Sequence, residues 1–147
     1  MPANFSWHFL CMKREFLNRL NDFILSLDSI YDVNSGGCAF VSWCIAKNLE
    51  KYHSKYKIVL YDGDREVSAK VNFNNNKGVY HVWVRCLGID INGYNEENVY
   101  NKYLISLNSK QIKHYYDKAI WNDSYRKDLN AVISRKINNF FKNNFIC

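Results

Sequence analysis

Hydrophobic residues recur every three or four positions over the first part of the chain. This period predicts an amphipathic helix over 9–31, with polar residues such as Lys13 and Asp22 on its solvent side. A loop rich in Asp, Asn, Ser and Gly follows it. A second helix, with a more continuous apolar surface, is predicted from Cys38 to about Tyr52.

The middle of the chain changes to the period of two that is typical of β-strands. A short apolar run at 57–61 predicts one strand, and alternating apolar residues predict another over 66–73. The residues from 79 to 85 are strongly β-prone, and 89–91 is predicted to be the partner of that strand in a hairpin.

The last part of the chain, 94–147, returns to a helical and more polar pattern. Helices are predicted over 95–107, 110–120 and 124–141. No repeat and no linker separates the parts, so we expect a single domain over 1–147. Helices followed by strands and then by further helices indicate an α+β fold.

Composition agrees with a globular protein and excludes several other classes. Of the 147 residues, 48% are hydrophobic and 16% aromatic, which is enough for a packed core and excludes wholesale disorder. No apolar run reaches the roughly 20 residues that cross a bilayer, and the N-terminus lacks the pattern of a secretory signal. We therefore expect a cytoplasmic protein without a membrane partner, or one in a host cytoplasm or a virion if its source is viral.

Five cysteines bear on both compartment and chemistry: Cys11, Cys38, Cys44, Cys86 and Cys147. An odd number cannot be fully paired within one chain, and without a secretory signal we expect reduced thiols. No Cys-x-x-Cys pair is present and the four histidines are scattered. The sequence therefore predicts no metal site and no cofactor.

Cys38 is the strongest candidate for a reactive residue because of its position. It directly follows Gly36 and Gly37 and opens the second predicted helix. The helix dipole at that end favours a thiolate, and the glycines leave room for a substrate carbonyl to approach. The Cys38 backbone N–H can also donate to a developing oxyanion. A small buried residue at the start of a helix shows the same pattern, so position alone does not establish a nucleophile.

His81 and two residues of the hairpin are candidate partners for that thiol. His81 opens a strand, where a neutral imidazole can accept a proton from a thiol on a neighbouring helix. If Leu87-Gly88 forms a two-residue turn, Asn92 lies diagonally across from His81 on the same face and can orient its ring. A register two residues tighter puts Asp90 there instead. An Asp and an Asn that flank a turn and cap the following helix fit the pattern equally well.

The order of these residues resembles the papain-like and transglutaminase-like cysteine hydrolases over 34–93. The resemblance lies in three segments: Asn34-Ser35-Gly36-Gly37-Cys38-Ala39-Phe40, Tyr80-His81-Val82-Trp83-Val84 and Ile89-Asp90-Ile91-Asn92-Gly93. It implies that Cys38 is a nucleophile at the start of a helix packed on a small antiparallel sheet. It also implies that His81 is the general base and that Asp90 or Asn92 orients it. The implied reaction is attack on an amide bond of a peptide or protein, as in a peptidase, deamidase or transglutaminase.

The sequence departs from the papain pattern at the oxyanion position. Papain-like enzymes place a Gln six residues before the Cys, but here that residue is Asp32, which cannot donate a hydrogen bond when ionised. The resemblance then leaves the Asn34 amide and the Cys38 backbone to hold the oxyanion. Substrate would pass Gly36, Gly37 and Trp83.

Two other functions remain open at the level of sequence. The departure at Asp32 is compatible with a non-catalytic structural or interaction protein that keeps the hydrolase scaffold, for example in a phage particle. The net charge of +6 is compatible with nucleic-acid binding. Basic and aromatic residues occur together near the C-terminus: Arg126, Lys127, Arg135, Lys136 and Lys142, with Tyr115, Tyr116, Trp121 and Tyr125. An ordinary solvated helix face has the same composition, so we do not expect nucleic acid to be the partner, and the oligomeric state stays open.

Overall fold

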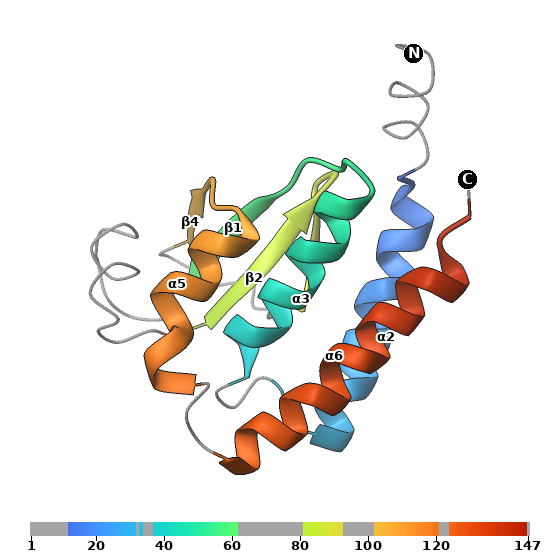
Figure 1. Cartoon of the computed structure of the whole chain (residues 1–147). Coiled ribbons are helices and arrows are strands. Elements are labelled where there is room, and N and C mark those ends of the chain that lie inside the picture. The colour runs from blue at the N-terminus through green and yellow to red at the C-terminus, as the bar shows by residue number, and fades with distance from the viewer. Residues whose placement is uncertain are drawn as a thin grey trace.

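The computed structural model has a layer of helices packed on a small antiparallel sheet (Figure 1). The structure describes residues 12–31, 33, 37–61, 81–92, 102–120 and 124–146. Its elements are α2 (Arg14–Tyr31), α3 (Cys38–Lys51), β1 (Lys57–Tyr61), β2 (His81–Cys86), β3 (Ile89–Ile91), β4 (Lys102–Ile105), α5 (Ser109–Ile120) and α6 (Ser124–Asn144). The expected α+β class is confirmed.

The described strands form one antiparallel sheet in the order β3-β2-β1-β4. Leu87 and Gly88 make the two-residue turn between β2 and β3, with backbone φ angles of 50° and 75°. Two positive φ angles in succession give the type of turn that matches the twist of a hairpin. The resulting register pairs Arg85 with Asp90, as the sequence predicted.

The described helices cover one face of this sheet (Figure 1). α3 lies over β2, while α2 packs on β3 and runs beside α6. The predicted apolar side of α2 is buried in the core: Phe16, Leu17, Leu20, Ile24 and Leu27. Full burial of one such side chain contributes about 1.5–3 kcal/mol, so packing rather than helix propensity holds α2 in place.

Aromatic side chains join α2 to α6. The Phe16 ring meets Phe141 and Phe145 edge-on, with ring centroids 5.2 Å and 5.4 Å apart. Phe23 stacks on Phe140 with a centroid distance of 4.6 Å. These contacts bring together the first and last helices that the structure describes.

One predicted helix begins too early and another is wrong in type. The helix predicted over 9–31 begins only at Arg14 in the structure, and Met12 and Lys13 before it are not helical. Residues 9–11 lie outside the described residues. The helix predicted over 95–107 is also wrong where the structure describes it, since 102–105 forms β4. This short segment pairs with β1 on the side away from β2, and its apolar residues are too few for their period to distinguish strand from helix.

The remaining predicted elements are either confirmed or untested. The predictions for α3, β1, the hairpin and α5 agree with the structure within one or two residues, and α6 extends three residues beyond the predicted end. The strand predicted over 66–73 and the residues from 94 to 101 lie outside the described part of the chain. None of the helices in the described ranges has the length and apolar character that crossing a bilayer requires.

Candidate active site around Cys38 and His81

Cys38 is the first residue of α3, as predicted, and Gly37 is the residue that caps the helix. Gly37 supplies no side-chain hydrogen bond to the helix, and the first turn contains no acidic residue. The positive end of the helix dipole therefore acts on Cys38 without a neutralising carboxylate in that turn, which favours the thiolate. The side chain is 6% exposed, so only a small part of it reaches the surface.

A hydrogen bond between α3 and β2 shows how Cys38 and His81 are brought to the same end of the sheet. The Ser42 hydroxyl donates to the Val82 carbonyl oxygen at 3.2 Å. Cys38 lies one helical turn before Ser42 on the same side of α3, and His81 directly precedes Val82. Because α3 and β2 run in the same direction (Figure 1), both residues lie where these two elements begin.

The alternation of β2 determines which face of the sheet holds the imidazole. Val82 and Val84 belong to the core that the helices cover, whereas the equally buried Trp83 does not. His81 shares the face of Trp83, and the centroids of their rings are 5.2 Å apart. The His81 ring therefore lies on the Trp83 face of β2, at the end of the sheet where α3 begins.

A backbone carbonyl orients the His81 ring. The Nε2 atom of His81 lies 2.9 Å from the carbonyl oxygen of Asn92, and the histidine is 4% exposed. A carbonyl oxygen only accepts hydrogen bonds, so Nε2 carries a proton, and the neutral form of the ring then has its lone pair on Nδ1. The sequence associated Asn92 with His81, but the group that contacts the ring is the main chain of Asn92 and not its side-chain amide.

Asp90 lies opposite Arg85 rather than beside His81. Its carboxylate accepts two hydrogen bonds from the Arg85 guanidinium, at 2.6 Å and 3.1 Å. The hydrogen bond to Asp90 raises the pKa of Arg85, which partial burial would otherwise lower. Of the two orienting residues that the sequence proposed, the structure therefore brings Asn92 to the histidine and pairs Asp90 with an arginine.

Asn92 is held in an unusual conformation by a residue that the sequence did not single out. Its φ of 66° is left-handed, a region that Asn tolerates better than most residues. Its backbone N–H donates to the Asn21 side-chain oxygen on α2 at 2.8 Å. Asn21 belongs to the predicted polar side of its helix, so nothing in its spacing marked it as a support for the site.

The side-chain amide of Asn92 is buried, and neither its nitrogen nor its oxygen has a hydrogen-bond partner among the described residues. Leaving a buried polar group unpaired costs about 1–3 kcal/mol. Such a group beside a histidine is suited to bind a water molecule or a polar part of a ligand.

The other described thiols differ from Cys38 in their surroundings. Burial raises the pKa of Cys44 to about 12, although a hydrogen bond with Ser134 opposes this shift. Burial also raises the pKa of Cys86 to about 11. Both thiols therefore stay protonated near neutral pH, and Cys38, Cys44 and Cys86 are all free of disulfides.

The structure describes only some of the remaining residues that the sequence predicted for the site. Asp32, Asn34 and Gly36 lie outside the described residues. Trp83 has no exposed surface, so it supports the His81 ring rather than offering a face to a substrate. In the described ranges, no group of three or more His, Cys, Asp or Glu side chains is arranged to hold a metal ion.

Comparison with known proteins identifies no family for this chain. No protein-family model, no curated protein and no solved structure matches the chain.

Proposed function

We propose that this protein is a thiol-dependent hydrolase or acyl transferase that acts on an amide bond of a peptide or protein. The observation that carries the proposal is the contact between His81 Nε2 and the Asn92 carbonyl oxygen. It fixes a buried imidazole in the tautomer whose Nδ1 can accept a proton. It does so at the end of the sheet where α3 begins with Cys38.

The proposed chemistry is acyl transfer through a thioester. His81 Nδ1 takes the proton of Cys38, and the thiolate attacks the amide carbonyl carbon to form a C–S bond. The negative oxygen of the intermediate is held by the Cys38 backbone N–H and the Asn34 amide. The C–N bond then breaks as His81 returns its proton to the leaving amine. A water or amine activated by His81 attacks the thioester, and the C–S bond breaks to restore the thiol.

The fold expected for this chemistry is the papain-like or transglutaminase-like core, which we propose on two features. A cysteine opens the helix α3, which packs on an antiparallel sheet, and a histidine opens the neighbouring strand. The hairpin turn then brings the backbone of Asn92 to that histidine.

Alkylation of the folded protein with iodoacetamide, mapped by mass spectrometry from pH 6 to pH 9, tests the proposal. We expect Cys38 to react fastest, with a rate that levels off well below the pKa of about 8.5 of an ordinary cysteine. His81→Gln should slow the reaction of Cys38 by about tenfold or more at pH 7, because a glutamine does not accept the proton. Cys44 and Cys86 serve as internal controls, since their raised pKa values predict slow labelling.

Asp90→Asn is the matched control, because it changes a hairpin residue that is paired with Arg85. We expect this variant to leave the pH profile of Cys38 labelling unchanged. Equal slow labelling of all three thiols would instead favour a non-catalytic interaction protein. A crystal structure with the Cys38 sulfur more than about 6 Å from His81 would exclude the dyad, because proton transfer needs hydrogen-bond reach.

A further inference from the structure

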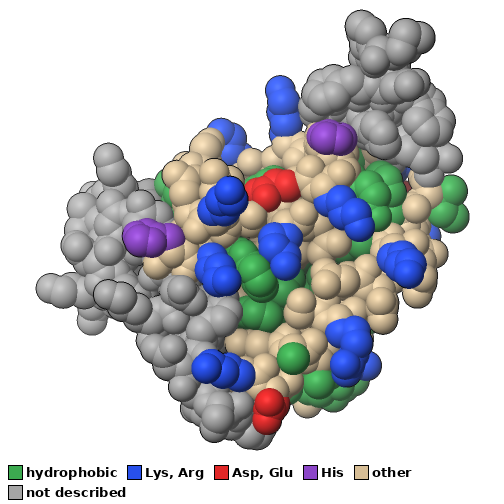
Figure 2. All heavy atoms as spheres, viewed as in Figure 1, with side chains coloured by type: hydrophobic (Ala, Val, Ile, Leu, Met, Phe, Trp, Pro, Cys, Tyr) green, Lys and Arg blue, Asp and Glu red, His purple; other side chains and the backbone are tan. Residues whose placement is uncertain are grey.

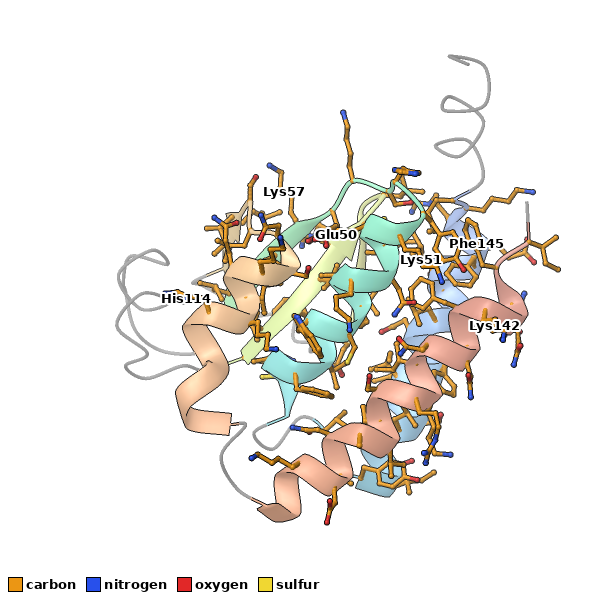
Figure 3. The ribbon with its side chains drawn as sticks, viewed as in Figure 1. Glu50, Lys51, Lys57, His114, Lys142 and Phe145 are labelled. Atoms are coloured by element: carbon orange, nitrogen blue, oxygen red, sulfur yellow. The ribbon has the colours of Figure 1, made fainter. Side chains whose placement is uncertain are left out.

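A groove between α3 and α6 has a volume of about 290 Å³ and is lined by basic and amide side chains. Its lining includes three lysines and three asparagines: Lys47, Lys51, Lys142, Asn48, Asn138 and Asn139. Among the described residues, no Asp or Glu lines it. Figure 3 shows that Lys51 and Lys142 come from the two neighbouring helices.

The walls of this groove are held by a hydrogen bond between the helices. The Asn48 side-chain nitrogen on α3 donates to the Asn138 side-chain oxygen on α6 at 2.8 Å. The same nitrogen donates to the Cys44 carbonyl oxygen at 2.8 Å. Asn48 is buried, so this bond fixes how far apart the two helices lie.

The positive charge of the groove is not neutralised within the described part of the chain. None of its lysines forms a salt bridge with a described carboxylate, and the described salt bridge joins Arg85 to Asp90 elsewhere. Glu50 of α3 is next to Lys51 in sequence, but its carboxylate accepts hydrogen bonds from Tyr56 and Ser109. An anionic ligand would therefore meet several ammonium groups that no described carboxylate neutralises.

The basic surface continues from the groove across α3 to α5. The Lys47 ammonium lies 4.0 Å from the centroid of the Trp43 ring, and the Lys113 ammonium of α5 lies 5.6 Å from it. Figure 2 shows Lys and Arg side chains spread over this face of the molecule, with few acidic ones among them. We call the surface formed by Lys113, Trp43, Lys47, Lys51 and Lys142 the basic strip.

The sequence alone did not lead us to expect a nucleic-acid partner, but the fold gathers these lysines on one surface. We propose that the basic strip binds the phosphate backbone of a single-stranded nucleic acid. Lysines from three helices can pair with successive phosphates, and neutralising phosphates releases condensed counterions, which favours binding. Asparagine amides donate to phosphate oxygens, and a base can stack on the half-buried Trp43 ring where it displaces the Lys47 ammonium toward a phosphate. This function is separate from the proposed hydrolase and does not depend on it.

Fluorescence anisotropy of a labelled single-stranded 20-mer, titrated with the full chain at several salt concentrations, tests the strip. The double variant Lys51→Gln/Lys142→Gln should bind about tenfold or more weakly at 50 mM salt. The negative slope of log K against log salt should become shallower by about 1.4, because each lost lysine–phosphate contact removes about 0.7 from its magnitude for a single strand. Lys51→Arg/Lys142→Arg should keep binding, which separates loss of charge from loss of fold.

The matched control is Lys13→Gln/Lys55→Gln, which removes the same charge outside the groove and should change binding little. An equal loss in the control, or no binding by the wild type at 50 mM salt, would overturn the proposal. Equally strong binding of poly-glutamate would also overturn it and assign the strip to acidic polypeptides. Cys38→Ala should bind the oligonucleotide normally, so a failed hydrolase proposal would not affect this result.

Discussion

At the residue scale, burial divides the thiols by chemical role. Cys44 has no exposed surface, and burial raises its pKa to about 12. Cys86 is nearly as buried, and its Sγ–H donates to the Lys55 carbonyl oxygen at 3.3 Å. Both behave as small apolar residues of the core, whereas Cys38 has the helix start that favours a thiolate.

The raised pKa of Cys44 predicts that the protein loses stability in alkali. An unfolded thiol loses its proton near pH 9.0, while the folded thiol keeps it to about pH 12. Between these values the folded state binds more protons, so the free energy of unfolding falls as pH rises, by up to about 1.4 kcal/mol per pH unit for one such group. Below pH 9 this group gives no pH dependence.

Urea unfolding at pH 8, 9, 10 and 11 measures this effect. Cys44→Ala should be less stable at pH 8 because of the lost packing, but its stability should fall less steeply above pH 9. Tyr56 adds a parallel loss that remains in the variant, because burial and Glu50 also raise its pKa. Identical slopes in the two proteins would refute the prediction.

At the element scale, the beginning of α5 depends on a residue of α3. The Glu50 carboxylate accepts hydrogen bonds from the Ser109 backbone N–H at 2.9 Å and from the Ser109 hydroxyl at 2.6 Å. The Tyr56 hydroxyl donates to the same carboxylate at 2.5 Å. Asn108 and Gln111 also exchange hydrogen bonds between side chain and backbone across the first turn, which is the reciprocal cap of a helix N-terminus.

Glu50→Ala should destabilise the protein by about 2–3 kcal/mol. The change removes a carboxylate from the positive end of a helix and leaves the Tyr56 hydroxyl and the Ser109 donors without their partner. The midpoint of urea unfolding measures the loss. Asp22→Ala, at an exposed position of α2, is the control and should change stability by no more than about 0.5 kcal/mol. A loss for Glu50→Ala as small as that of the control would show that the cap contributes little.

At the scale of the whole molecule, α2 and α6 pack side by side (Figure 1), and their aromatic contacts hold the two ends of the described chain together. Phe141 has no exposed surface and contacts both Phe16 of α2 and Tyr52 beyond α3. Its ring therefore links three parts of the helical layer.

Phe141→Ala should lower the free energy of unfolding by about 3–5 kcal/mol, because it removes buried apolar surface and leaves a cavity. Chemical denaturation followed by circular dichroism measures the change. Ile146, which is 77% exposed, supplies the control Ile146→Ala, which should have an effect within about 0.5 kcal/mol. Equal effects of the two substitutions would mean that α6 is not anchored through this ring.

Local patterns in the sequence were sufficient for most elements of the fold. The period of apolar residues identified α2, α3, β1 and the hairpin, and a two-residue turn fixed the register in which Arg85 faces Asp90. The prediction failed at β4, because the partner that makes 102–105 a strand is β1, more than forty residues earlier in the chain. The pattern of apolar residues within 102–105 therefore does not indicate that β1 is its partner.

The sequence by itself determined the α+β class, the position of Cys38 at a helix start and the pairing of His81 with the neighbourhood of Asn92. These depend on periods and turns that act over a few residues. Only the tertiary structure decided that a main-chain carbonyl orients His81, and that lysines of α3, α5 and α6 form one surface. The physical reason is distance along the chain: Asn48 and Asn138 are 90 residues apart, yet their hydrogen bond sets the width of the basic groove.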